Sequence, residues 1–126
     1  MTYLIVFLGA GIGGALRHGV NRGAVQLFGE GFPIGTLTVN VLGSLLMGML
    51  AGYFALRTGI DQHWKLFFAT GVLGGFTTFS AFSLDAVLLY ERGSYGSFAL
   101  YVIGSVALSI VALFAGMALV RTGSHL

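Results

Sequence analysis

Four long apolar segments constrain this chain more than any other feature of its sequence. They cover residues 3–16, 34–56, 66–89 and 98–120. A helix needs about 20 residues to cross the hydrocarbon core of a bilayer, so the last three segments are long enough as they stand. The first reaches that length only by continuing through Arg17 and His18 toward Val20. Because it lacks the basic start of a signal peptide, it is interpreted as the first membrane helix.

The composition agrees with a chain that lies almost entirely in the membrane. Of its 126 residues, 56% are hydrophobic and 8% are charged, whereas about a quarter are charged in soluble domains. Glycine occurs 21 times, and small residues let membrane helices approach each other closely. The connections, residues 22–33, 57–65 and 91–97, are short. The sequence therefore predicts an all-α membrane protein in which residues 1–126 form a single domain of four transmembrane helices.

Several other classes of protein are excluded by what the chain lacks. It has no cysteine, hence no disulfide framework and no thiolate metal site. Its net charge of +2 is small and scattered, which argues against nucleic acid as a partner. Residues 9–14 match the G-x-G-x-x-G pattern of nucleotide-binding folds. No alternation of strands and helices follows to complete such a fold, so we expect no nucleotide and interpret Gly9 and Gly13 as a helix contact.

Basic residues give almost no signal for the orientation of the chain. Three fall on each side of the membrane, with Arg57, Lys65 and Arg121 on the side of the termini and Arg17, Arg22 and Arg92 on the other. Orientation normally follows the Lys/Arg bias between short loops. One interpretation is a weak signal that is corrected during insertion. The other is insertion in both orientations, which would allow an antiparallel dimer.

The third apolar segment contains a run that a simple membrane helix does not need. Residues 71–83 read GVLGGFTTFSAFS. Glycines and hydroxyls at membrane depth loosen a helix and free backbone carbonyls, which is tolerated only where protein or a water-filled path surrounds them. We therefore expect the third helix to be broken near its middle. Together with the polar cluster TLTVN at residues 36–40, this run predicts a small permeation pathway.

Polar side chains recur at helical spacing on two of the predicted helices. Four-residue intervals, which place side chains on one helix face, separate the members of two sets, Thr36, Asn40 and Ser44 and then Tyr101, Ser105 and Ser109. Serine and threonine can bond to the preceding turn of their own helix, so a structural interpretation of the hydroxyls stays open. Asn40 has two donor hydrogens and an acceptor oxygen, more than the local backbone satisfies. It is either a contact between helices or part of the pathway.

Phe79 and Phe82 are three residues apart and so neighbour each other on a helix face. Ordinary packing against lipid or core is the default interpretation. The alternative depends on the aromatic ring, which is positively polarised at its edge. Ring edges directed into a narrow path would offer an anion weak contacts without a fixed charge. Such contacts suit conduction, which requires several weak sites.

Two runs resemble the signatures of the Fluc/CrcB family of fluoride channels: GTLTVNVLGS at residues 35–44 and GGFTTFSAFS at residues 74–83. GGALR at residues 13–17 is similar to that family's first-helix motif. The resemblance implies a fluoride-selective ion channel, not an enzyme, in a bacterial inner membrane. It also implies passive export of fluoride through two pores at the interface of an antiparallel, dual-topology homodimer. A structural sodium ion, Na+, is implied at the dimer centre.

The resemblance also implies roles for particular residues. The fluoride pore would be formed by Asn40, Phe79, Phe82, Thr36, Tyr101, Ser105 and Ser109. Arg17 would lie in a basic vestibule, and the backbone carbonyls of Gly74 and Thr77 would hold sodium. The chain departs from the family pattern at Ala81, where threonine is common, and at Asp85, where glutamate is usual.

Other functions fit the residues less well. Small multidrug transporters are also dual-topology proteins with four helices, but they depend on a glutamate in the first helix. Residues 3–20 contain no carboxylate, and Asp85 is the one acidic residue in an apolar segment. A metalloenzyme is disfavoured because His18, His63 and His125 lack the spacing of metal ligands. A purely structural subunit would not need the amide, the hydroxyls and the glycine-rich run together.

Overall fold

The computed structural model describes residues 1–57 and 59–123, so that His125 lies outside the described residues. Four helices in this range are long and apolar enough to cross a membrane, namely Thr2–Phe28, Ile34–Leu56, Gln62–Glu91 and Tyr95–Gly123. The predicted four membrane spans are confirmed, and the protein is a multi-pass membrane protein. The first span is longer than its apolar segment, because the helix continues through Arg17 and Arg22.

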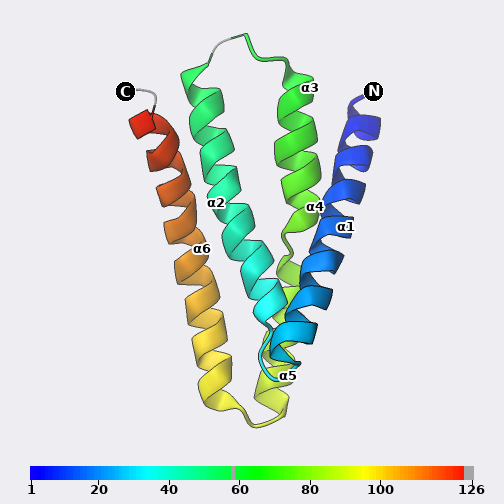
Figure 1. Ribbon diagram of the computed structural model, residues 1–126, viewed down its shortest axis with the longest axis vertical. Coiled ribbons are helices and arrows are strands. Elements are labelled where there is room, and N and C mark those ends of the chain that lie inside the picture. The colour runs from blue at the N-terminus through cyan, green and yellow to red at the C-terminus, as the bar shows by residue number, and fades with distance from the viewer. Residues whose placement is uncertain (58, 124–126) are drawn as a thin grey trace.

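Three of the spans are single helices and the third is composite. The single helices are α1 (Thr2–Phe28), α2 (Ile34–Leu56) and α6 (Tyr95–Gly123). The third span consists of α3 (Gln62–Lys65), the π-helical segment η1 (Leu66–Leu73), α4 (Gly74–Phe76) and α5 (Phe79–Glu91). Both termini and the α2–α3 connection lie at one end of the molecule, and the other two connections lie at the opposite end (Figure 1). The sequence predicted this arrangement of ends.

Glycines allow two pairs of spans to touch backbone to backbone. In α1, a β-carbon on Gly9 would lie 2.7 Å from the carbonyl oxygen of Phe67, and one on Gly13 would overlap the carbonyl oxygen of Val72. Both glycines are buried against the third span. The structure thus confirms the interpretation of Gly9 and Gly13 as a helix contact, because any larger side chain would push the helices apart.

The second close contact joins α2 to α6. A β-carbon on Gly48 would overlap the carbonyl oxygen of Leu113, and one on Gly116 would overlap that of Leu45. We call this contact, defined by Leu45, Gly48, Leu113 and Gly116, the α2–α6 seam. It fixes α6 along α2 for much of their length (Figure 1).

The third span bends at Thr77 and Thr78. Helix α4 ends at Phe76, and both threonines have extended backbone angles, φ −86° and ψ 160° for Thr77 and φ −154° and ψ 123° for Thr78. Helix α5 begins at Phe79. The π-helical geometry of η1, just before the bend, is a finding that the sequence did not predict. Such wide turns are rare in helices and are frequent at functional sites.

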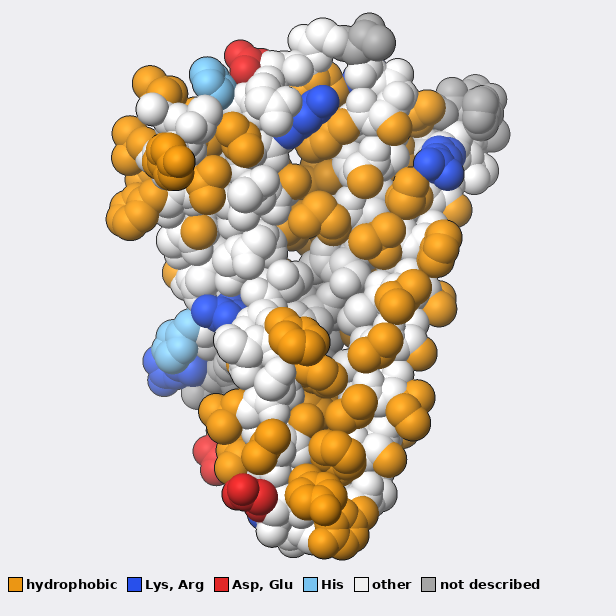
Figure 2. Space-filling view, turned by 180° about the vertical axis from the view of Figure 1, so that it is seen from behind, with side chains coloured by type: hydrophobic (Ala, Val, Ile, Leu, Met, Phe, Trp, Pro, Cys, Tyr) orange, Lys and Arg blue, Asp and Glu red, His pale blue; other side chains and the backbone are white. Residues whose placement is uncertain are grey.

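Most apolar side chains face outward, as expected of spans surrounded by lipid or by a partner chain. Hydrophobic side chains line the flank formed by α6 along its whole length (Figure 2). A buried cluster forms between α5 and α6, near the end opposite the termini, and consists of Phe82, Ala86, Leu89 and Tyr101. This cluster positions one side of the site described next.

Candidate functional site

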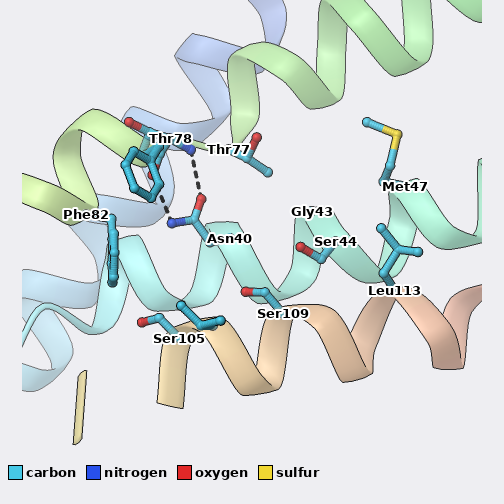
Figure 3. A pocket seen from close by; sticks show the side chains of 12 residues that line it. Asn40, Gly43, Ser44, Met47, Thr77, Thr78, Phe82, Ser105, Ser109 and Leu113 are labelled. Atoms are coloured by element: carbon cyan, nitrogen blue, oxygen red, sulfur yellow. Dashed lines mark hydrogen bonds between the residues drawn. The ribbon is translucent and has the colours of Figure 1, made fainter. Parts of the chain in front are cut away.

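A groove of about 300 Å³ runs between α2, the bend and α6. Five of the seven residues predicted to form a pore line it, namely Asn40, Phe79, Phe82, Ser105 and Ser109. The remaining lining residues are Gly43, Ser44, Met47, Thr77, Thr78, Val106 and Leu113 (Figure 3). The groove contains no charged side chain. Residues that are far apart in the sequence are therefore brought together around one open, mainly neutral cavity.

Asn40 joins α2 to the bend through both ends of its amide. Its Nδ2 donates to the carbonyl oxygen of Thr78 over 3.0 Å, and the backbone N–H of Thr78 donates to Asn40 Oδ1 over 2.8 Å (Figure 3). In a continuous helix this N–H would donate to the carbonyl of Gly74. The side chain of Asn40 thus replaces a helical partner, which supports the contact between helices that the sequence left open. The second hydrogen of Nδ2 has no partner in the described part of the chain.

The hydroxyl of Thr78 replaces a second helical hydrogen-bond partner at the bend. Its Oγ1 accepts from the backbone N–H of Ala81 over 3.2 Å and caps the start of α5. In a continuous helix the N–H of Ala81 would donate to the carbonyl of Thr77. Two side chains therefore take the donors that would otherwise satisfy the carbonyls of Gly74 and Thr77. These are the two carbonyls that the resemblance assigns to sodium.

Other hydroxyls of the 71–83 run are satisfied within their own helix. Thr77 Oγ1 donates to the carbonyl of Leu73 over 3.1 Å, and Ser83 Oγ donates to that of Phe79 over 3.0 Å. This is the ordinary bonding of such side chains to the preceding turn. The structural interpretation therefore holds for Thr77 and Ser83, whose hydroxyls are occupied.

Ser105 differs from these residues because its hydroxyl is buried without a partner. The residue is 5% exposed, and its Oγ makes no hydrogen bond within the residues that the structure describes. It lines the groove together with Ser109, one turn further along α6. A buried polar group without a partner costs about 1–3 kcal/mol. Ser105 Oγ is therefore a hydroxyl beside the groove whose hydrogen-bonding capacity no described residue uses.

The two phenylalanines stand at different depths beside the groove. Phe79 is 77% exposed, whereas Phe82 is 9% exposed and belongs to the buried cluster. Their ring centroids are 5.5 Å apart, with the ring planes inclined at 44°. The prediction that these two side chains lie next to each other is confirmed. Their direction toward an anion remains a prediction.

Tyr101 and Thr36 do not line the groove. Tyr101 is 1% exposed and packs behind Phe82, with ring centroids 5.1 Å apart. Its hydroxyl donates to Asp85 Oδ2 over 3.2 Å, so the shortened carboxylate at this position has a tyrosine as its partner. Thr36 is buried and lines a second cavity, of about 300 Å³, together with Asp85. The sequence did not predict the pairing of Tyr101 with Asp85, because their separation of 16 residues spans two helices.

Arg17, the predicted vestibule residue, does not line the groove of this chain. It is half-buried on α1. No group of three or more His, Cys, Asp or Glu side chains suited to a metal occurs in the described residues. A cation at the bend would therefore need backbone carbonyls. Because Asn40 and Thr78 accept the hydrogen bonds of the usual helical donors, the carbonyls of Gly74 and Thr77 are left without those donors.

Comparison with known proteins gives consistent matches over almost the whole chain. The model of the family described as "CrcB-like protein, Camphor Resistance (CrcB)" matches residues 4–117. A protein of Rhodopseudomonas palustris named fluoride-specific ion channel FluC is 60% identical over 121 residues, which cover 96% of this chain and 98% of that protein. Nitrobacter hamburgensis has a relative named fluoride-specific ion channel FluC 2, also 60% identical. A third relative, from Methylobacterium nodulans, is 58% identical over 96% of this chain and 97% of its own length.

Proposed function

Because the chain belongs to the CrcB-like family, we propose that it is a fluoride-selective channel whose anion path follows the groove between α2, the bend and α6. The family resemblance predicted from the two motifs is confirmed. The named relatives are ion channels, so this is not a family of enzymes. Their names also favour a channel over the small multidrug transporter that the sequence left as an alternative.

The unpartnered hydroxyl of Ser105 is the observation that carries this proposal. Fluoride is small and strongly hydrated, so a pore must replace its water with close hydrogen-bond donors. Ser105, Ser109 and the second hydrogen of Asn40 Nδ2 are such donors beside one groove. The lining has no basic side chain, so the anion meets several weak contacts instead of one strong site. Weak, multiple contacts allow an ion to leave as well as to enter.

The exposed ring of Phe79 supports a pore that is completed by a second copy of the chain. This large apolar side chain lines the groove but is mostly exposed in the single chain. In the proposal, two antiparallel copies close two equivalent grooves, since a twofold axis repeats every feature of the interface. The equal numbers of basic residues on the two sides agree with insertion in both orientations.

A sodium ion at the dimer centre is the second element that the proposal takes from the family resemblance. The bend is interpreted as the predicted break in the third helix. The carbonyls of Gly74 and Thr77 have lost their helical donors to Asn40 and Thr78. Carbonyl oxygens are suitable ligands for a hard monovalent cation, as in the filters of cation channels. Such an ion would stabilise the interface between the two bends.

Export needs no coupled energy source in this proposal. A negative cell interior drives an anion outward by about 2.3 kcal/mol per charge for each 100 mV. The groove has no carboxylate to relay protons, because Asp85 lies outside it and accepts from Tyr101. We expect the protein in a bacterial inner membrane.

The test is anion efflux from liposomes that contain the purified protein. Fluoride is expected to leave rapidly and chloride at the rate of protein-free liposomes. Ser105→Ala removes the unpartnered hydroxyl and should slow fluoride efflux at least tenfold, because a hydrogen bond to a charged group contributes about 1.5–3 kcal/mol and about 1.4 kcal/mol is a factor of ten in rate. Ser97→Ala is the matched control, because Ser97 lies on the same helix outside the groove. Equal efflux of chloride and fluoride, or equal effects of the two variants, would contradict the proposal.

A further inference from the structure

The loop between α1 and α2 is joined by one arginine to the α5–α6 turn, which lies at the same end of the molecule. Arg92, at the end of α5, donates from Nη2 to the carbonyl oxygen of Gly31 over 2.8 Å, across 61 residues of sequence. A hydrogen bond with a charged donor is stronger than one between neutral groups. This exposed hydrogen bond is a contact between the loop and the end of α5 at the residue that precedes Phe32.

Phe32 connects this contact to Tyr101. Its ring meets that of Tyr101 edge to face, with centroids 5.6 Å apart and planes at 87°. Edge-to-face contact is a preferred geometry of aromatic pairs. Tyr101 is thereby held on three sides, by Phe32, by Phe82 and through its hydroxyl by Asp85.

Tyr101 in turn supports the deeper ring of the groove. It is almost fully buried, and it packs on Phe82, which lines the groove. Neither Arg92, Gly31 nor Phe32 lines the groove. We propose that these three residues, here called the loop clamp, position Tyr101 and through it Phe82, so that the loop at one end of the molecule sets the rate of anion passage. This inference rests on the proposed function.

A residue that only strengthens the fold would make the same contacts, so the test needs a measurement that fold strength alone does not change. Phe32→Ala is expected to slow fluoride efflux about tenfold while size-exclusion profiles stay unchanged. It should also accelerate flipping of the Tyr101 ring, measured by NMR on protein with labelled tyrosine and assigned with Tyr101→Phe. Phe32→Leu, which keeps apolar bulk, is the milder variant should the alanine protein fail to fold. It is expected to lie between the alanine variant and the wild type in both measurements.

The matched control is Tyr95→Ala. It removes an aromatic contact at the same end of the molecule, because the rings of Tyr95 and Tyr90 lie 5.2 Å apart, but it leaves the contacts of Tyr101 intact. Arg92→Gln should reproduce the effects of Phe32→Ala more weakly, since Phe32 would keep its place in the loop for part of the time.

A double-mutant cycle separates positioning from independent packing. If the clamp acts through Tyr101, adding Phe32→Ala to a Tyr101→Leu protein should cost less than it costs alone, because residues that act through one another are not additive. Additive losses, equal losses in Tyr95→Ala, or unchanged efflux and ring flipping in Phe32→Ala would each overturn the clamp. Absence of fluoride efflux from liposomes that contain the wild-type protein would contradict both the proposed function and the clamp. The other results would contradict the clamp alone.

Discussion

The α2–α6 seam and the bend at Thr77 and Thr78 both lie where two spans meet, but their backbone polar groups are satisfied in different ways. Along the seam, both helices are regular and glycines let one backbone lie directly on the other. At the bend the backbone of Thr77 and Thr78 is extended, and the side chains of Asn40 and Thr78 take the places of helical partners. Lipid satisfies no backbone polar group, so an extended backbone inside a span needs such substitutes. The seam joins α2 to α6, whereas the bend leaves the carbonyls of Gly74 and Thr77 without their helical donors, which the proposed ion site requires.

Asn40→Asp, which alters the bend, is expected to cause the largest loss of fluoride efflux. The change is nearly isosteric, but it removes the donor to the carbonyl of Thr78 and puts a negative charge beside the groove. Fluoride efflux from liposomes should fall to the level of protein-free liposomes. Efflux above a tenth of the wild-type rate would mean that the amide is needed neither for the bend nor for the anion.

Gly116→Val tests the seam with an effect of intermediate size. The new side chain would overlap the carbonyl of Leu45, so the helices must separate. Overpacking of this kind costs about 1–3 kcal/mol of unfolding free energy, measurable as reduced thermal stability in detergent. Gly116 itself lies outside the groove, although Leu113 of the seam lines it, so the protein that remains folded should conduct. Gly104→Val, at a glycine of the same helix with open space around it, is the control and should change stability little.

Ser83→Ala should have the smallest effect and separates two kinds of hydroxyl. Ser83 Oγ bonds to its own helix at Phe79, whereas Ser105 Oγ has no partner in the described chain. Loss of a bond to the preceding turn is expected to change stability by less than about 1 kcal/mol. Fluoride efflux should stay within twofold of the wild type. An effect as large as that of Ser105→Ala would show that a free hydroxyl is not what matters.

The sequence predicted the spans and much of the groove for identifiable reasons. Apolar length alone defines a membrane helix, and the four-residue spacing of Asn40 with Ser44 and of Ser105 with Ser109 defines a face. These faces do meet around one groove. The sequence predicted that α1 continues through Arg17 toward Val20, but the helix extends to Phe28, because a charge such as Arg22 ends an apolar segment without ending a helix.

Contacts between residues that are far apart in the sequence could not be predicted from it. Spacing along one helix does not reveal the partner supplied by another, so the pairing of Asn40 with Thr78 was missed, as was the contact of Phe32 with Tyr101. The pairing at Thr78 also depends on the extended backbone of Thr77 and Thr78. The glycine- and hydroxyl-rich run at residues 71–83 predicted a break in this span but not the residues at which it would fall. The π-helical geometry of η1 has no signature in composition or period.

Fluoride efflux through Phe79→Ile and Phe82→Ile proteins tests whether the groove carries fluoride past these two rings. Isoleucine keeps most of the apolar bulk but has no positively polarised ring edge. Packing residues tolerate such swaps with losses below about 1.5 kcal/mol, so both variants should give the same size-exclusion profile as the wild type. Both variants are expected to lose most of their fluoride efflux. Near-normal efflux through both would contradict a fluoride path along the groove and leave the two rings as packing residues.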